Sequence, residues 1–207
     1  KNLYDFLSRM QRNHEKGVNK SVLKSLIVSG GFDNFSGTRK DKLEKLEDLS
    51  NLGKILKANE SIIFDKYGEG YFDTWMNYKN EEMDIQDLLA EEKRVTSFYI
   101  SGHPTEKYLS VAQKESDYQP IGNLDGLSSG TSVYLLGIVN SVRQITTKTG
   151  QLMAFVSIED TTGHCDLVVF SDSYKMFGRY LEVGEVLNVF ATKQVGARGT
   201  SYIVNSI

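Results

Sequence analysis

The sequence predicts an α+β chain of several domains, in which short helices precede a helical connector and a small five-stranded β-barrel. Apolar residues recur three and four apart in the first half, whereas the last third has short β-type runs divided by glycine-containing turns. Charge changes too: residues 1–57 carry 12 Lys and Arg against 7 Asp and Glu, residues 58–130 carry 6 against 14, and residues 131–207 carry 6 against 6. We therefore expect three domains with these boundaries.

Composition excludes several classes of protein. Hydrophobic residues make up 40% of the 207 residues and charged residues 25%, which excludes wholesale disorder. The single cysteine, Cys165, excludes a disulfide framework and fits a reducing, cytoplasmic setting. No apolar run is long enough to span a membrane, so we expect no membrane partner. The chain begins at Lys1 without a methionine, and we expect it to be a piece of a longer protein.

The first part, residues 1–57, reads as short helices. One apolar face spans residues 3–10 and another spans residues 22–27, with Asn19 as the expected N-cap and Gly30-Gly31 as the stop. Thr38 and Asp41 resemble a capping box before a third helix. Short helices joined by tight turns fit a helix-hairpin-helix arrangement. Its basic residues, Lys20 and Lys24 among them, would meet DNA phosphates, or else form an ordinary solvated face.

The middle part, residues 58–130, reads as an acidic connector with one helix. Residues 59–83 mix aromatic and acidic residues without clear periodicity, and they pack on a neighbour or bind a partner. A helix is expected from Asp84 to about residue 100, because Ser-Gly-His-Pro follows. Glycines and serines at 113–130 predict a flexible joint. The three histidines have no metal-ligand spacing, so we predict no metal site.

The last part, residues 131–207, reads as three strands, a helix and two strands. The strands are expected at residues 133–142, 153–158, 165–170, 185–192 and 201–207, with the helix at 172–181. Gly137 lies where a strongly bent strand needs a glycine. This order is that of an OB-fold, a small barrel that commonly binds oligonucleotides through strands 2 and 3 and the loops after strands 1 and 4.

Single-strand binding needs stacking surfaces and positive charge, and the barrel offers both in small amounts. Strand 2 alternates so that Phe155 lies on the open face, while Leu152 and its alternate neighbours point inward. The candidate cations flank the two loops; they are Arg143, Lys148, Lys193 and Arg198. Nearby acidic residues cancel much of that charge, which favours weak binding. Cys165 reads as a core residue rather than a nucleophile.

Several sequence blocks occur together in a family-specific order. They are FLSR (6–9), VNKSVL (18–23), LIVSGGFD (26–33), EK (92–93), FYISGHP (98–104), TKTGQLMAF (147–155) and EDTTG (159–163). Together they resemble the C-terminal portion of the bacterial replicative DNA polymerase III alpha subunit. The resemblance covers nearly the whole chain and implies a part that follows the catalytic domains.

The resemblance implies a role in DNA replication. In that family the helix-hairpin-helix region holds duplex DNA, the OB domain is associated with the single-stranded template, and a short peptide between them binds the sliding clamp. The nearest match to that peptide is Glu60, Ile63 and Phe64, with Glu60 where the family has glutamine. The parent would be a DNA-directed DNA polymerase, a nucleotidyltransferase using Mg²⁺, with other replisome subunits as partners. For this fragment itself we predict no catalytic residues and no cofactor.

Two other functions remain open from the sequence. The nearly neutral barrel and the acidic connector also fit a replisome interaction scaffold with little DNA binding of its own. The barrel pattern also fits a tRNA anticodon-binding OB module, although no synthetase ATP-site motif is present.

Overall fold

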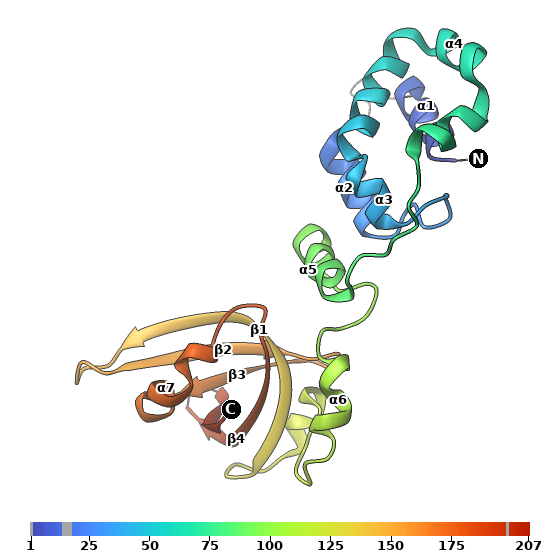
Figure 1. The fold of residues 1–207 in the computed structure, drawn as a ribbon. Helices are drawn as coiled ribbons and strands as arrows, with labels where there is room; N and C mark the ends of the chain where they lie inside the picture. The colour runs from blue at the N-terminus through green and yellow to red at the C-terminus, as the bar shows by residue number, and fades with distance from the viewer. Residues whose placement is uncertain (1, 14–17, 198) are drawn as a thin grey trace. The chain divides into compact units, whose positions relative to one another are not determined.

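The computed structural model describes residues 2–13, 18–197 and 199–207; for residues 11–13 and 57–71 it describes the helical backbone alone. The chain forms two compact units, Lys1–Ser101 and Gly102–Ile207 (Figure 1). The division at 57 and 130 stays a prediction from charge. Within the described residues no helix is both long enough and apolar enough to cross a membrane.

The first unit is helical. Its helices are α1 (Leu3–Asn13), α2 (Lys20–Val28), α3 (Arg39–Glu44), α4 (Leu46–Met76) and α5 (Ile85–Thr96). The expected caps are confirmed: the Asn19 side chain accepts a hydrogen bond from the Val22 N–H at 2.9 Å, and Thr38 and Asp41 form a reciprocal capping box. Gly30 follows α2 with φ of +80°, a conformation that favours glycine.

Helix α4 extends into residues 59–76, although the sequence shows no clear periodicity there. It continues through the aromatic and acidic segment to Met76, where Asn77 ends it in a left-handed conformation. Phe72 and Met76 are buried in the helical core, and the Phe72 ring lies 5.7 Å from that of Tyr4 on α1. Packing against α1 therefore supplies the apolar contacts that the local sequence spacing does not reveal.

A buried carboxylate fixes the end of the first unit. Glu92 of α5 is fully buried and accepts hydrogen bonds from the backbone N–H groups of Ile100 at 2.7 Å and Ser101 at 2.9 Å. Arg39 of α3 contributes an ion pair at 2.8 Å. Helix α5 ends at Thr96, earlier than expected, because Ser97 turns the chain back toward Glu92.

The second unit is a closed barrel with short helices. Its elements are α6 (Glu106–Ala112), the 3-10 turn η1 (Ile121–Gly126), β1 (Ser132–Thr146), β2 (Leu152–Glu159), β3 (His164–Val169), α7 (Ser171–Phe177), η2 (Gly178–Tyr180), β4 (Val186–Gly196) and β5 (Gly199–Ser206). The strand order is β1-β2-β3-β5-β4, with β3 and β5 parallel. The expected OB-fold barrel is confirmed.

Gly137 lies on β1 where the barrel wall bends over the core. A Cβ atom there would come within 2.9 Å of Ile158 Cδ1 and 3.2 Å of the Glu159 carbonyl oxygen. The core around it consists of side chains from all five strands and from η1. A glycine at this position lets β2 approach β1 closely.

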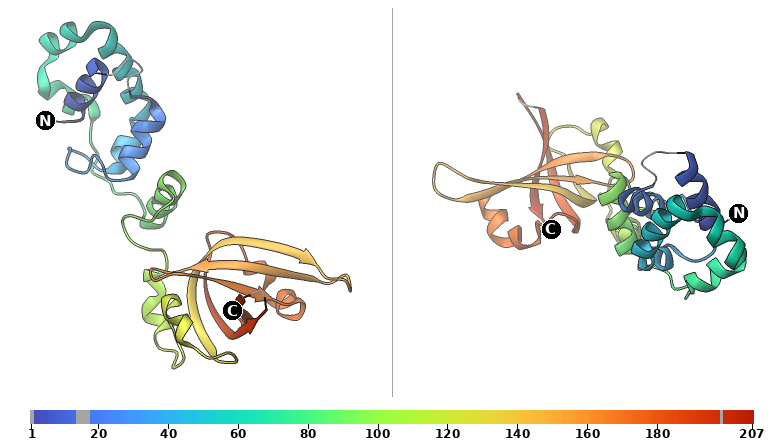
Figure 2. Two further views of the ribbon diagram at one scale, coloured as in Figure 1. Left: turned by 180° about the vertical axis from the view of Figure 1, so that it is seen from behind. Right: turned by 90° about the horizontal axis from the view of Figure 1, so that it is seen from above.

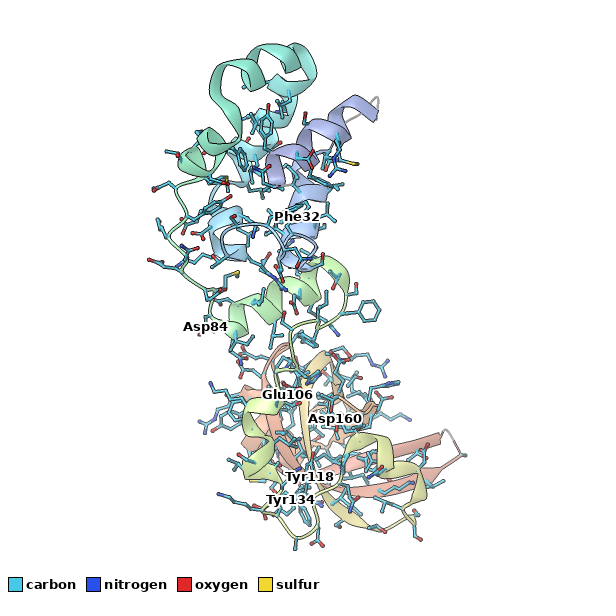
Figure 3. The ribbon with its side chains drawn as sticks, turned by 90° about the vertical axis from the view of Figure 1, so that its right-hand side faces the viewer. Phe32, Asp84, Glu106, Tyr118, Tyr134 and Asp160 are labelled. Atoms are coloured by element: carbon cyan, nitrogen blue, oxygen red, sulfur yellow. The ribbon has the colours of Figure 1, made fainter. Side chains whose placement is uncertain are left out.

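Residues 121–131 correct the expectation of a flexible joint. Ile121 and Leu124 are buried in the barrel core, and the Ile121 N–H donates to Asp160 Oδ2 at 2.9 Å. Just before this segment, Tyr118 and Tyr134 form a parallel bridge and lie side by side (Figure 3). This segment is part of the barrel unit because its apolar side chains complete the core.

Candidate nucleic-acid interface

The hairpin of β1 and β2 has an exposed outer half, residues 143–155, which is called the β1–β2 arm below. The arm projects from the barrel in Figures 1 and 2. Its strands stay paired up to Thr146 and Leu152. The loop is closed by hydrogen bonds from Thr147 N–H to the Gln151 carbonyl at 2.7 Å and from Gly150 N–H to the Thr147 carbonyl at 2.9 Å.

Arg143 and Phe155 lie opposite each other on this arm. They are register partners on β1 and β2, and the Arg143 guanidinium carbon lies 4.9 Å from the centre of the Phe155 ring. Phe155 is half-buried between the buried residues Ala154 and Val156, so its side chain points to the outer face, as expected. The pair is a cation–π contact on the surface of the sheet.

Lys148 lies in the exposed loop of the arm. With Arg143 it gives the arm two positive charges, and the arm carries no acidic residue. Leu152 is 44% exposed, which corrects its assignment to the core, because β2 begins there beyond the barrel next to the loop. The arm therefore combines exposed apolar surface with positive charge.

The other end of the same face is acidic. Asp166 on β3 is exposed and lies opposite Ser157, and Glu159 lies opposite His164. The Asn140 side chain donates to Glu159 at 2.7 Å. A phosphate backbone is repelled from this end of the face and attracted to the arm.

Lys193, one of the second pair of predicted cations, does not lie with Arg143 and Lys148 on the arm. Lys193 is only 5% exposed, and its ammonium donates to the carbonyl oxygens of Leu124 at 2.7 Å and Asp125 at 3.2 Å. It is therefore a structural residue that holds η1 on the barrel, and its assignment to the DNA-contacting surface is wrong. Arg198 lies outside the described residues. The β4–β5 hairpin also leaves the barrel in a different direction from the β1–β2 arm in the view from above (Figure 2).

The candidate cations of the first unit are engaged in ion pairs. Lys20 pairs with Glu47 of α4, and Lys24 pairs with Glu91 of α5 at 2.8 Å. Both pairs are at least partly exposed, so each contributes little to stability. Hydrogen bonds from Arg94 and Lys24 lower the pKa of Glu91 to about 2.

The candidate clamp peptide lies within helix α4. The structure describes only the helical backbone at Glu60, Ile63 and Phe64, so no side-chain contacts are assigned to them.

Asp160 is a structural residue that ties the barrel to the segment before it. Its Oδ1 accepts from the N–H groups of Thr162 at 2.7 Å and Gly163 at 3.0 Å, and Thr162 Oγ1 in turn accepts from Gly122 N–H at 2.8 Å. The Asp-Thr-Thr-Gly spacing predicts the local turn. Sequence reasoning missed the contact with residues 121–122, because nothing local indicates a partner almost forty positions away.

A metal cluster and a reactive cysteine are both absent from the described residues. No three His, Cys, Asp or Glu side chains among them are grouped so that they could hold a metal ion, so the Mg²⁺ expected for a polymerase has no ligand set there. Cys165 is buried, and burial raises its pKa to about 12, which keeps the thiol protonated and unreactive.

Comparison with known proteins identifies the relatives of the chain. Residues 133–207 match the family model of an OB-fold nucleic acid binding domain. DNA polymerase III subunit alpha of Borreliella burgdorferi is 33% identical over 89% of this chain, and that of Aquifex aeolicus is 28% identical over 100%. The chain is a relative of part of the bacterial DNA polymerase III alpha subunit.

The chain spans 16% of the length of each of these two polymerase subunits. Among solved structures, the second OB-fold domain of replication protein A from Methanococcus maripaludis covers 43% of this chain, with 15% identity and a TM-score of 0.34; 90% of that domain is aligned.

Proposed function

We propose that this chain is a non-catalytic section of a replicative DNA polymerase III alpha subunit, and that its OB barrel binds the single-stranded template. The observation that carries the proposal is the β1–β2 arm, where the Arg143 and Phe155 pair lies on the outer face and Lys148 lies in the loop. A stacking surface beside positive charge is what single-strand binding requires. With only two cations on the arm, we expect weak, salt-sensitive binding.

Nucleotidyl transfer belongs, in this proposal, to other sections of the longer protein. That reaction needs carboxylates converging on metal ions. The relatives are polymerase subunits, which supports this activity for the whole protein rather than for the described residues.

The helical unit is proposed to hold duplex DNA through Lys20 and Lys24. Both lysines face carboxylates, Glu47 and Glu91. Exposed ion pairs contribute about 0–1 kcal/mol, so a DNA phosphate can replace either carboxylate at little cost. Clamp binding through Ile63 and Phe64 is a separate proposal, tested by titrating the chain with a sliding clamp: Phe64→Ala should abolish any complex.

A replisome interaction scaffold is the second candidate. It is favoured by a groove of about 630 Å³ between η2 and β4, lined in part by Met176, Tyr180 and Leu187. Met176 is 58% exposed, and a partly apolar groove of this kind suits a protein segment. The family model that matches the barrel is named for tRNA anticodon binding, but the two relatives above are polymerase subunits that align with 89% and 100% of this chain, which favours the polymerase assignment over the anticodon-binding alternative.

Fluorescence anisotropy with a labelled oligothymidylate and a matched duplex, at low and moderate salt, tests the template-binding proposal. We expect the single strand to bind more tightly than the duplex. Lys148→Ala should weaken binding several-fold and reduce the log–log salt slope by about 0.7, because the variant neutralises one phosphate fewer.

Lys114→Ala is the matched control, because Lys114 is an exposed lysine of the same unit that follows α6 and does not lie on the arm. It should leave affinity unchanged. Absence of binding at low salt, or an equal decrease of affinity in both variants, would overturn template binding by the arm and favour the scaffold.

A further inference from the structure

We infer that the nucleobase stacks on the guanidinium of Arg143, with Phe155 as the support beneath it; this inference rests on the proposed function. The sequence analysis placed a stacking surface at the Phe155 ring and gave Arg143 only as a cation beside the loop. The geometry moves the stacking surface to Arg143, because the guanidinium lies over the ring at 4.9 Å from its centre.

The surroundings of Phe155 leave its ring little free surface. Arg143 is its register partner on β1, and Val168 is its register partner on β3. Directly opposed residues of neighbouring strands point to the same face of a sheet, so the ring is flanked on both sides. Phe155 itself is only partly exposed, whereas Arg143 is exposed. The flat surface that remains open to a ligand is therefore the outer face of the guanidinium.

The Arg143 guanidinium is also available to stack on a base. Among the residues that the structure describes, no carboxylate pairs with it, and the acidic residues Glu159 and Asp166 lie further along the face. A guanidinium is planar and stacks on aromatic groups, whereas a lysine ammonium is a point charge. A phosphate contact would draw the guanidinium away from the Phe155 ring, while a stacked base leaves the cation–π pair in place.

The ligand that fits is an unpaired nucleobase whose backbone runs toward Lys148. The base forms a third layer above Arg143 and Phe155, and the loop lysine meets the adjoining phosphate. A base in a duplex has both faces covered by its neighbours and cannot form this layer. The arm thereby selects single strands by the availability of a base face rather than by base sequence.

The test uses the full chain and a single strand that carries one 2-aminopurine, whose fluorescence falls when it stacks. The key variant is Arg143→Lys, which keeps the charge and removes the plane. We expect wild type to quench the probe, and Arg143→Lys to bind roughly tenfold more weakly with an unchanged salt slope and little quenching. Lys148→Ala should keep the quenching of the bound probe and lower the salt slope.

An otherwise identical strand with an abasic site in place of the probe base separates stacking from charge. It should bind wild type and Arg143→Lys with the same affinity. If Arg143→Lys binds and quenches like wild type, while Phe155→Leu does not quench, the ring is the stacking surface and the inference fails although template binding stands. If wild type binds no strand, the proposed function fails as well. Circular dichroism spectra of the variants establish that each is folded.

Discussion

At the scale of single residues, Glu92 holds the chain that follows α5, whose first residues the sequence assigns to the helix itself. Burial alone would raise the pKa of Glu92, but hydrogen bonds from Ser101 and from the backbone of Ile100, together with Arg39, lower it. The carboxylate is thus ionised although fully buried. It fixes Ile100 and Ser101, at the end of the first unit, to α5 and α3.

Glu92→Gln should destabilise the helical unit by about 1.5–3 kcal/mol, because the hydrogen bonds from charged and backbone donors weaken while Arg39 keeps Asp33 as a partner. Trp75, the single tryptophan, packs against the helical core and reports its unfolding in urea. Glu44→Gln is the control: it breaks the exposed pair with Lys79 and should leave the urea midpoint almost unchanged. Equal costs for both variants would contradict this role of Glu92.

Glu92 also makes the stability of the helical unit depend on pH. A carboxyl whose pKa is lower in the folded state stabilises it above its unfolded pKa, and that contribution disappears as pH falls through the folded value. For Glu92 and Glu91 the decline begins below about 4.5, and for Glu91 it extends to about 2. Urea midpoints measured across this range should fall steeply in wild type and less in Glu92→Gln. Parallel curves would show that Glu92 is not the acid-sensitive group.

Lys193 is a charged residue whose role is structural. Lys193→Met should destabilise the barrel by about 1–3 kcal/mol, since the carbonyl oxygens of Leu124 and Asp125 lose their donor. Oligonucleotide affinity of the folded variant should equal that of wild type. A variant with wild-type calorimetric stability and weaker DNA binding would restore Lys193 to the interface.

At the scale of elements, close packing of β1 on β2 depends on Gly137. Gly137→Val should cost about 1–3 kcal/mol through overpacking against Ile158, measured as a lower calorimetric midpoint for the barrel. Gly126→Ala is the control, because a Cβ there meets nothing within 4 Å and should leave the midpoint unchanged. A neutral Gly137→Val would mean that the barrel wall tolerates a wider separation of these strands.

The secondary-structure elements also show which features of the fold could be predicted from the sequence. Strand alternation and turn residues located all five strands, and Asn19 and the pair of Thr38 and Asp41 marked helix starts, because these signals act within a few positions. The course of α4 beyond residue 57, the burial of Lys193 and the attachment of residues 121–131 depend on partners far away in the chain. For the interface, alternation placed Phe155 correctly, but the guanidinium that covers it required the register between β1 and β2.

At the scale of the whole molecule, the chain has two separate hydrophobic cores. The described core residues of one unit fall between Leu3 and Met76, and those of the other between Ile121 and Val204. Each core is built from its own unit alone, so the units should fold independently. Fragments 1–101 and 102–207 should each unfold cooperatively, with midpoints matching two calorimetric transitions of the full chain. A fragment that stays unfolded would contradict this independence.

The central claim is that the β1–β2 arm holds a single strand, and an amide chemical-shift titration of the full chain with oligothymidylate tests it most directly. We expect the shifts to concentrate in residues 143–155, including Arg143 and Lys148, and the groove beside Tyr180 to stay unchanged. Shifts confined to that groove, or to the acidic end near Asp166, would contradict the claim.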